Sequence, residues 1–241
     1  MEFCLGPDET MEVFLEGALR IIQKRTGYRF SVDAILLSQF ISLRKKDKAV
    51  DLGTGCGVLP LLLAKTTQAG SFVAVEIQKD LAALTRRNVA LNGLGGRVTV
   101  LQQDIKALPA TFPPGSFDVV LSNPPYRKTL TGRINPSLEK AIARHEMKGS
   151  LDDLMRVAAY LLPTGGRCYL IYSAVRAVDL LVTLRHHRLE PKRLRIVHPK
   201  GEDDAKFVLV ESIKEGGVEL KIMKPLFLDE PDRRLKPARS G

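Results

Sequence analysis

The chain has 241 residues, 44% of them hydrophobic, which allows one α/β domain with additions or two small domains. No apolar run approaches the roughly 20 residues of a membrane span, and no basic start followed by an apolar stretch predicts a signal peptide. The 37 basic and 27 acidic residues give a net charge of +10, which favours a polyanionic partner such as nucleic acid, although many basic proteins bind none.

The cysteines and histidines show no spacing typical of a metal site or a disulfide framework. Cys4, Cys56 and Cys168 are far apart and odd in number, and the four histidines are scattered. We therefore expect no metal, and a reduced, cytoplasmic compartment.

Apolar runs alternate with helical patterns along most of the chain. Buried strands are predicted at 48–53, 71–78, 97–104, 117–123 and 165–172. Helices are predicted at 57–65, 79–94, about 149–162 and 173–187. A terminal pair of strands is expected at 192–199 and 205–213. Strands separated by helices pair in parallel through right-handed crossovers, so the pattern indicates an α/β fold.

The pattern also suggests how the chain is divided. Residues 1–45 form an N-terminal segment expected to pack on the main domain, with a helix over Ile35 to Phe40. The main α/β domain covers 46–215. Residues 216–241 are expected to add a strand and a flexible basic tail, which could contact a polyanion.

A glycine-rich loop, "DLGTGCG" at 51–57, lies between the first strand and its helix. Gly53, Gly55 and Gly57 let the backbone turn tightly and approach a ligand at the carboxyl edge of the sheet. The dinucleotide fingerprint G-x-G-x-x-G would require a glycine where Val58 stands. The loop alone is therefore a weak indication of a cofactor site.

Acids follow the next two strands in order. Glu76, about 20 residues beyond the glycines, can accept hydrogen bonds from both hydroxyls of a ribose. Asp104, after the third strand, is placed to meet an adenine amino group. Each acid alone could be a solvated strand end. A glycine turn followed by two such acids is a much sharper indication of a nucleoside-containing cofactor.

The fourth strand is followed by "SNPPY" at 122–126. Proline cannot continue a strand, so a rigid turn is the simplest interpretation. The Asn123 side-chain oxygen and the Pro124 carbonyl can also accept hydrogen bonds from a planar amino group, and the Tyr126 ring can stack on it. With Pro125 fixing the turn, these residues are the catalytic candidates.

The order of these motifs resembles the class I S-adenosylmethionine-dependent methyltransferases over roughly residues 30–213. The resemblance implies a Rossmann-like, seven-stranded, mostly parallel sheet with helices on both faces and an antiparallel terminal strand. It implies that S-adenosylmethionine is the cofactor, held by the glycine loop, the two acids and their neighbours. The residues so implied are Asp51, Gly53, Thr54, Gly55, Gly57, Glu76, Ile77, Asp104, Ile105 and Asn123.

Two further segments resemble the bacterial tRNA adenine-N6 methyltransferases that modify position 37 of a valine tRNA. They are "YRFSVDAILLSQF" at 28–40 and "GRINPSLEKAIARHE" at 132–146. The resemblance implies RNA, most plausibly tRNA, as the partner. It also implies that Phe30, Ser31 and Asp33 help to close the cofactor site.

The chain departs from that group at Arg127, where an aromatic residue is expected. A basic patch for a phosphate backbone would comprise Arg127, Lys128, Arg133, Arg144 and His145. Three alternatives stay open: a protein glutamine methyltransferase, a methyltransferase of another RNA or DNA adenine, and a non-enzymatic RNA-binding module. The chain is expected to be a monomer or a weak homodimer.

Overall fold

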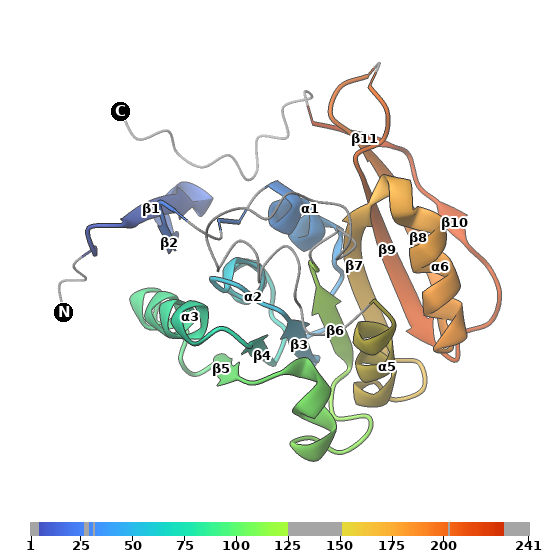
Figure 1. Cartoon of the computed structure of the whole chain (residues 1–241), viewed down its shortest axis with the longest axis horizontal. Coiled ribbons are helices and arrows are strands. Elements are labelled where there is room, and N and C mark those ends of the chain that lie inside the picture. The colour runs from blue at the N-terminus through green and yellow to red at the C-terminus, as the bar shows by residue number, and fades with distance from the viewer. Residues whose placement is uncertain (1–4, 27–28, 31, 125–150, 202, 229–241) are drawn as a thin grey trace.

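The computed structural model describes residues 5–26, 29–30, 32–124, 151–201 and 203–228. In these ranges the chain forms a nine-stranded sheet, covered by helices on both faces, and a separate two-stranded hairpin (Figure 1). The predictions for Ser31, for the end of the Asn-Pro-Pro-Tyr segment and for the basic patch after it lie outside the described residues.

The centre of the sheet consists of parallel strands in the order β5-β4-β3-β6-β7. Their bounds are β3 (Lys48–Leu52), β4 (Ser71–Glu76), β5 (Val98–Gln102), β6 (Val119–Ser122) and β7 (Arg167–Ser173). All five strands were predicted. Strand β5, predicted at 97–104, ends earlier than expected. Asp104 instead caps the 3-10 helix η2 (Ile105–Ala110) by accepting a hydrogen bond from the Lys106 amide.

The terminal pair of strands is confirmed as β8 (Leu189–His198) and β9 (Phe207–Lys214). A short connection makes the pair antiparallel, and β9 inserts between β8 and β7, antiparallel to both. These strands complete the expected seven-stranded sheet with its antiparallel strand. Two further two-residue strands, β10 (Lys221–Ile222) and β11 (Leu226–Phe227), extend the outer edge beside β8.

Side chains along the central strands alternate between two apolar layers, as a sheet covered on both faces requires. Ala49 and Tyr169 belong to the layer packed by α1 (Val32–Phe40), α2 (Val58–Thr66) and α3 (Lys79–Leu91). Val50 and Cys168 belong to the layer packed by α5 (Leu151–Leu161) and α6 (Ala177–His186). The helix expected at 173–187 is divided, since Ser173 ends β7 and η3 (Ala174–Arg176) precedes α6.

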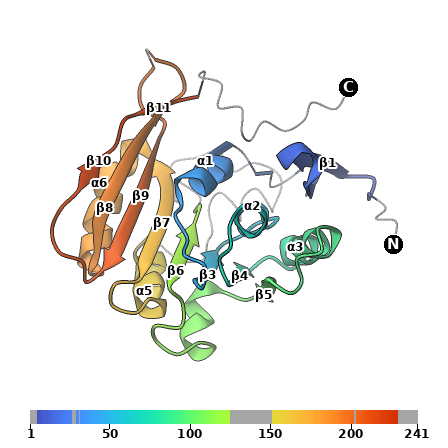
Figure 2. The ribbon, with the colours of Figure 1, turned by 180° about the vertical axis from the view of Figure 1, so that it is seen from behind.

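The N-terminal region contains a hairpin that the sequence pattern did not predict. Its strands, β1 (Glu9–Phe14) and β2 (Leu19–Lys24), are antiparallel and are joined by the 3-10 turn η1 (Leu15–Gly17). Its buried side chains, including Phe14 and Ile22, join the apolar layer of α1, α2 and α3. Both views show the hairpin next to α3 (Figures 1 and 2). Among the described residues, no helix has the length and apolar character needed to cross a bilayer.

Candidate cofactor and catalytic site

The predicted site residues follow adjacent strands at the carboxyl edge of the sheet. In the registers of the parallel strands, Glu76 pairs with Gln102 and Asp51 pairs with Leu121. Asp104 therefore comes two residues after the end of β5, Glu76 ends β4, the glycine loop leaves β3, and Asn123 immediately follows β6. Four elements separated by up to 72 residues thus contribute to one row. This is the edge at which open parallel sheets bind ligands.

The glycine loop adopts a backbone that favours glycine at three positions. Gly53, Gly55 and Gly57 have φ angles of 81°, 61° and 83°. Gly57 is also the N-cap of α2, and a Cβ there would lie 2.6 Å from the Cγ2 of Thr85 on α3. The protein's own helix α3 is therefore one reason for glycine at position 57, and the approach of the loop backbone to a ligand stays a prediction.

Glu76 is the side chain most directly joined to the loop. It is 5% exposed, its Oε2 accepts a hydrogen bond from the Gly55 amide at 2.9 Å, and its Oε1 accepts one from the Gln78 amide at 2.9 Å. Burial raises the pKa of the Glu76 carboxyl, and the backbone donors oppose the rise. Each oxygen of the Glu76 carboxylate can accept a further hydrogen bond, so the two oxygens can still accept hydrogen bonds from two ligand hydroxyls.

Asp51 is a buried carboxyl close to a second acid. Burial raises its pKa to about 7, the Thr54 side chain opposes this rise, and the negative charge of Glu76 adds to it. Thr54 is 4% exposed, and its hydroxyl is near enough to Asp51 to lower that pKa but makes no hydrogen bond of standard geometry with the described residues. A buried polar group without a partner is costly, so this hydroxyl is suited to meet a polar ligand.

The remaining predicted cofactor residues occupy different surroundings. The Oδ1 of Asp104 accepts a hydrogen bond from the Lys106 amide at 2.9 Å, and Ile105, the next residue, is buried. Ile77 is half-buried directly after Glu76. Phe30 packs on the hairpin, with its ring centroid 5.6 Å from that of Phe14. Asp33 is buried in the first turn of α1, and α1 packs on α2. That Phe30 and Asp33 bind the cofactor stays a prediction.

The candidate catalytic segment begins at a fixed point. The Ser122 hydroxyl donates to the Leu52 carbonyl at 2.7 Å, so the end of β6 is held to the end of β3 where the glycine loop begins. Asn123 is half-buried and Pro124 is buried. Pro125 and Tyr126 lie outside the described residues, as do the basic residues predicted to bind nucleic acid (Arg127, Lys128, Arg133, Arg144 and His145).

Two polar residues that support the loop were missed in the sequence. The Thr85 hydroxyl lies 2.7 Å from the Gly55 carbonyl, and the Asn88 amide donates to the Cys56 carbonyl at 2.9 Å. Both side chains are 0% exposed. The available signal was their position on α3: they share the buried, apolar face of the helix with Leu81 and Leu84.

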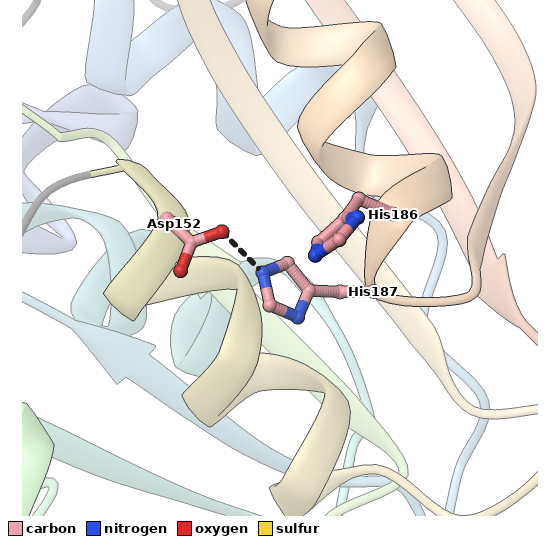
Figure 3. A group of neighbouring side chains, drawn as sticks. All are labelled: Asp152, His186 and His187. Carbon is pink, nitrogen blue, oxygen red and sulfur yellow. Dashed lines mark hydrogen bonds and ion pairs between the residues drawn. The ribbon is translucent and has the colours of Figure 1, made fainter.

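A second group of polar side chains connects α5 and α6. Asp152, His186 and His187 have possible ligand atoms within 4.8 Å of one another, and His187 Nε2 lies 2.8 Å from Asp152 Oδ1 (Figure 3). His186 and His187 are neighbours in the sequence, and the packing of α5 against α6 brings Asp152 to them. Asp152 and His186 are exposed, and the His187–Asp152 contact itself explains why the groups are close.

The parallel sheet, the glycine loop after β3, the acids after β4 and β5 and the Asn-Pro pair after β6 define a class I methyltransferase. The model of the methyltransferase small domain family matches residues 31–178, and the chain belongs to this family. Two solved structures share the fold: a predicted O-methyltransferase from Agrobacterium tumefaciens (TM-score 0.67, 23% identity, 85% of this chain and 92% of that one) and TrmN from Thermus thermophilus (TM-score 0.53, 22%, 75% and 48%).

Curated relatives match over most of their length. A protein of Tolumonas auensis is 31% identical over 222 residues, which cover 90% of this chain and 89% of the relative. A protein of Parabacteroides distasonis is 27% identical over 190 residues, covering 78% and 77%. Both relatives are named tRNA1(Val) (adenine(37)-N6)-methyltransferase.

The chain is therefore a methyltransferase, and S-adenosylmethionine is its cofactor. The described residues fit this group. Asp51 and Glu76 offer carboxylates suited to an ammonium group and to ribose hydroxyls, and the buried Thr54 hydroxyl on the glycine loop makes no hydrogen bond of standard geometry with the described residues. Bound S-adenosylmethionine supplies an electrophilic methyl group.

Proposed function

We propose that this methyltransferase modifies the N6 amino group of an adenine in RNA, and that the base is position 37 in the anticodon loop of a tRNA. The observation that carries the proposal is the Asn123–Pro124 pair, which follows β6 directly beside the strand that leads into the glycine loop. The names of the curated relatives support the choice of adenine and of tRNA.

The chemistry of the amino group explains why such a pair is useful. The lone pair of the adenine amino group is delocalised into the ring, which makes it a poor nucleophile. Hydrogen bonds from its protons to the Asn123 side-chain oxygen and the Pro124 carbonyl would return electron density to the nitrogen and fix its direction. Because proline has no N–H, Pro124 and the following Pro125 offer no competing donors. Catalysis would then depend on orientation and electrostatics.

The charge of the chain supports a nucleic-acid substrate. The net charge of +10 favours the phosphate backbone, and binding through it should weaken steeply as salt is raised. The basic residues after Tyr126 remain the predicted contacts. We also propose a cytoplasmic location, which suits the free thiols of Cys56 and Cys168. We further propose a monomer or weak homodimer, which light scattering on the purified chain would test.

The test is methyl transfer from labelled S-adenosylmethionine to unmodified tRNA, followed by digestion to nucleosides. Label in N6-methyladenosine, reduced in the Asn123→Ala variant, is the expected result, and sequencing the labelled tRNA would locate the base. Label in another nucleoside would refute the adenine assignment. Label in protein from a cell extract, with tRNA inert, would replace it with glutamine methylation.

A further inference from the structure

The outer edge of the N-terminal hairpin is paired with side chains of α3. On one side β2 pairs with β1, and on the other it meets two asparagines. The Ile22 amide donates to Asn88 Oδ1 at 2.7 Å, and Asn88 Nδ2 donates to the Ile22 carbonyl at 2.9 Å. Arg20 makes the same two bonds with Asn92, at 2.9 and 2.7 Å. Each side-chain amide thus makes the pair of bonds that a neighbouring strand would make.

The spacing explains why two asparagines four residues apart can do this. Residues i and i+4 of a helix are separated by about 6 Å along its axis. Residues i and i+2 of a strand are about 6.6 Å apart and present their amide and carbonyl groups to the same side. Asn88 on α3 and Asn92, the C-cap of α3, therefore match Ile22 and Arg20 on β2, and the edge of the hairpin is satisfied without a third strand.

The two asparagines differ in the group that accepts the second N–H of the side-chain amide. Asn92 Nδ2 donates to the Asn88 carbonyl within its own helix, at 2.7 Å. Asn88 Nδ2 donates to the carbonyl of Cys56, in the glycine loop, at 2.9 Å. Asn88 therefore contacts the hairpin and the cofactor loop with one side chain, whereas the side-chain hydrogen bonds of Asn92 join the hairpin to α3 itself.

The Cys56 carbonyl is one of three consecutive loop positions held by α3. The Gly55 carbonyl lies 2.7 Å from the Thr85 hydroxyl, and the Thr85 methyl group leaves no room for a side chain at Gly57. Gly55 in turn donates its amide to Glu76. A shift of the Cys56 carbonyl would thus move the residues that present Glu76 and Thr54 to the cofactor.

We propose that Asn88 is a positioning residue for the cofactor site, and that it makes the β1–β2 hairpin a working part of that site. The inference takes S-adenosylmethionine as the ligand and does not depend on which base or RNA is methylated. Through the Ile22–Asn88–Cys56 connection, the hairpin holds the glycine loop in its binding geometry. By linkage, a ligand on the loop stabilises the hairpin at Ile22.

The experiment compares Asn88→Ala with Asn92→Ala, since both changes remove two hydrogen bonds to β2. Affinity for S-adenosylhomocysteine is measured by calorimetry, and stability by thermal unfolding. Both variants should unfold at a lower temperature. Asn88→Ala should also raise the Kd about tenfold, as expected for the loss of one buried hydrogen bond, whereas Asn92→Ala should change it less than about twofold. Equal losses of affinity, or a wild-type Kd in Asn88→Ala, would overturn the proposal.

A measurement on the unchanged protein covers the case in which Asn88→Ala fails to fold. Addition of S-adenosylhomocysteine should slow hydrogen exchange of the Ile22 amide more than that of the Arg20 amide. Slowing of the loop amides with no change at Ile22 would refute the connection. If the wild type binds the ligand but methylates no adenine, the proposed function fails while this inference can still hold. If the wild type does not bind the ligand at all, both fail.

Discussion

Replacing Asp51 by asparagine should make the protein more stable and a worse binder of its cofactor. The pKa of this buried carboxyl is raised from 3.8 to about 7, chiefly because burial disfavours its charge. At 1.36 kcal/mol per pH unit, the difference corresponds to about 4 kcal/mol of unfolding free energy at alkaline pH. Asparagine has nearly the same shape and carries no charge to bury.

The sign fixes the pH range of the effect. Because the folded-state pKa is the higher one, the stabilising contribution of Asp51 is complete below pH 3.8 and is lost as the pH rises to about 7. Roughly 3 kcal/mol of the loss falls between pH 5 and pH 8. Asp51→Asn should therefore gain that much stability relative to the wild type between these two pH values. Glu76 titrates in both proteins, so comparing the two cancels most of its effect.

Urea unfolding of both proteins at pH 5 and pH 8 measures this difference. Asn123→Ala is the matched control, because it changes the same edge of the sheet and removes no titrating group, so its difference from the wild type should not depend on pH. An Asp51→Asn variant that is destabilised equally at both pH values would refute the reasoning, since the Asp51 carboxylate would then be stabilised in the fold. Calorimetry should show weaker binding of S-adenosylmethionine, because a neutral amide cannot pair with an ammonium group.

Outcomes are also expected for four further variants. Gly57→Ala should lower the unfolding free energy by about 2 kcal/mol or more, because its Cβ would meet Thr85 at 2.6 Å at a φ of 83°. Gly93 has a φ of 65°, and a Cβ added there would meet no atom within 4 Å. Gly93→Ala should therefore lower the unfolding free energy by only about 1 kcal/mol, and urea unfolding measures both variants. Asn123→Ala should lower kcat about 100-fold or more and leave the Kd for S-adenosylmethionine nearly unchanged; a lost affinity with normal kcat would assign Asn123 to the cofactor. Glu76→Gln should show the opposite pattern, raising the Kd about tenfold, and an unchanged Kd would remove Glu76 from the cofactor site.

Local patterns in the sequence were enough to predict the sheet and the row of site residues. Strands buried on both faces must be almost continuously apolar, so β3, β4, β6 and β7 could be recognised without knowing their neighbours. In a parallel sheet the carboxyl ends of the strands meet at one edge, so the order of the glycine loop, Glu76, Asp104 and Asn123 also indicated their proximity.

The tertiary structure alone decided the features that depend on distant partners. The outer edge of β2 is satisfied by Asn88 and Asn92, which are 66 and 72 residues away from Ile22 and Arg20, and no local pattern in residues 9–24 carries that information. The insertion of β9 between β7 and β8 likewise follows from pairing between strands. The raised pKa of Asp51 and the enclosure of the Thr54 hydroxyl arise from burial, which belongs to the packed molecule. Sequence periodicity records which face of an element is covered, and only the folded chain determines which groups cover it.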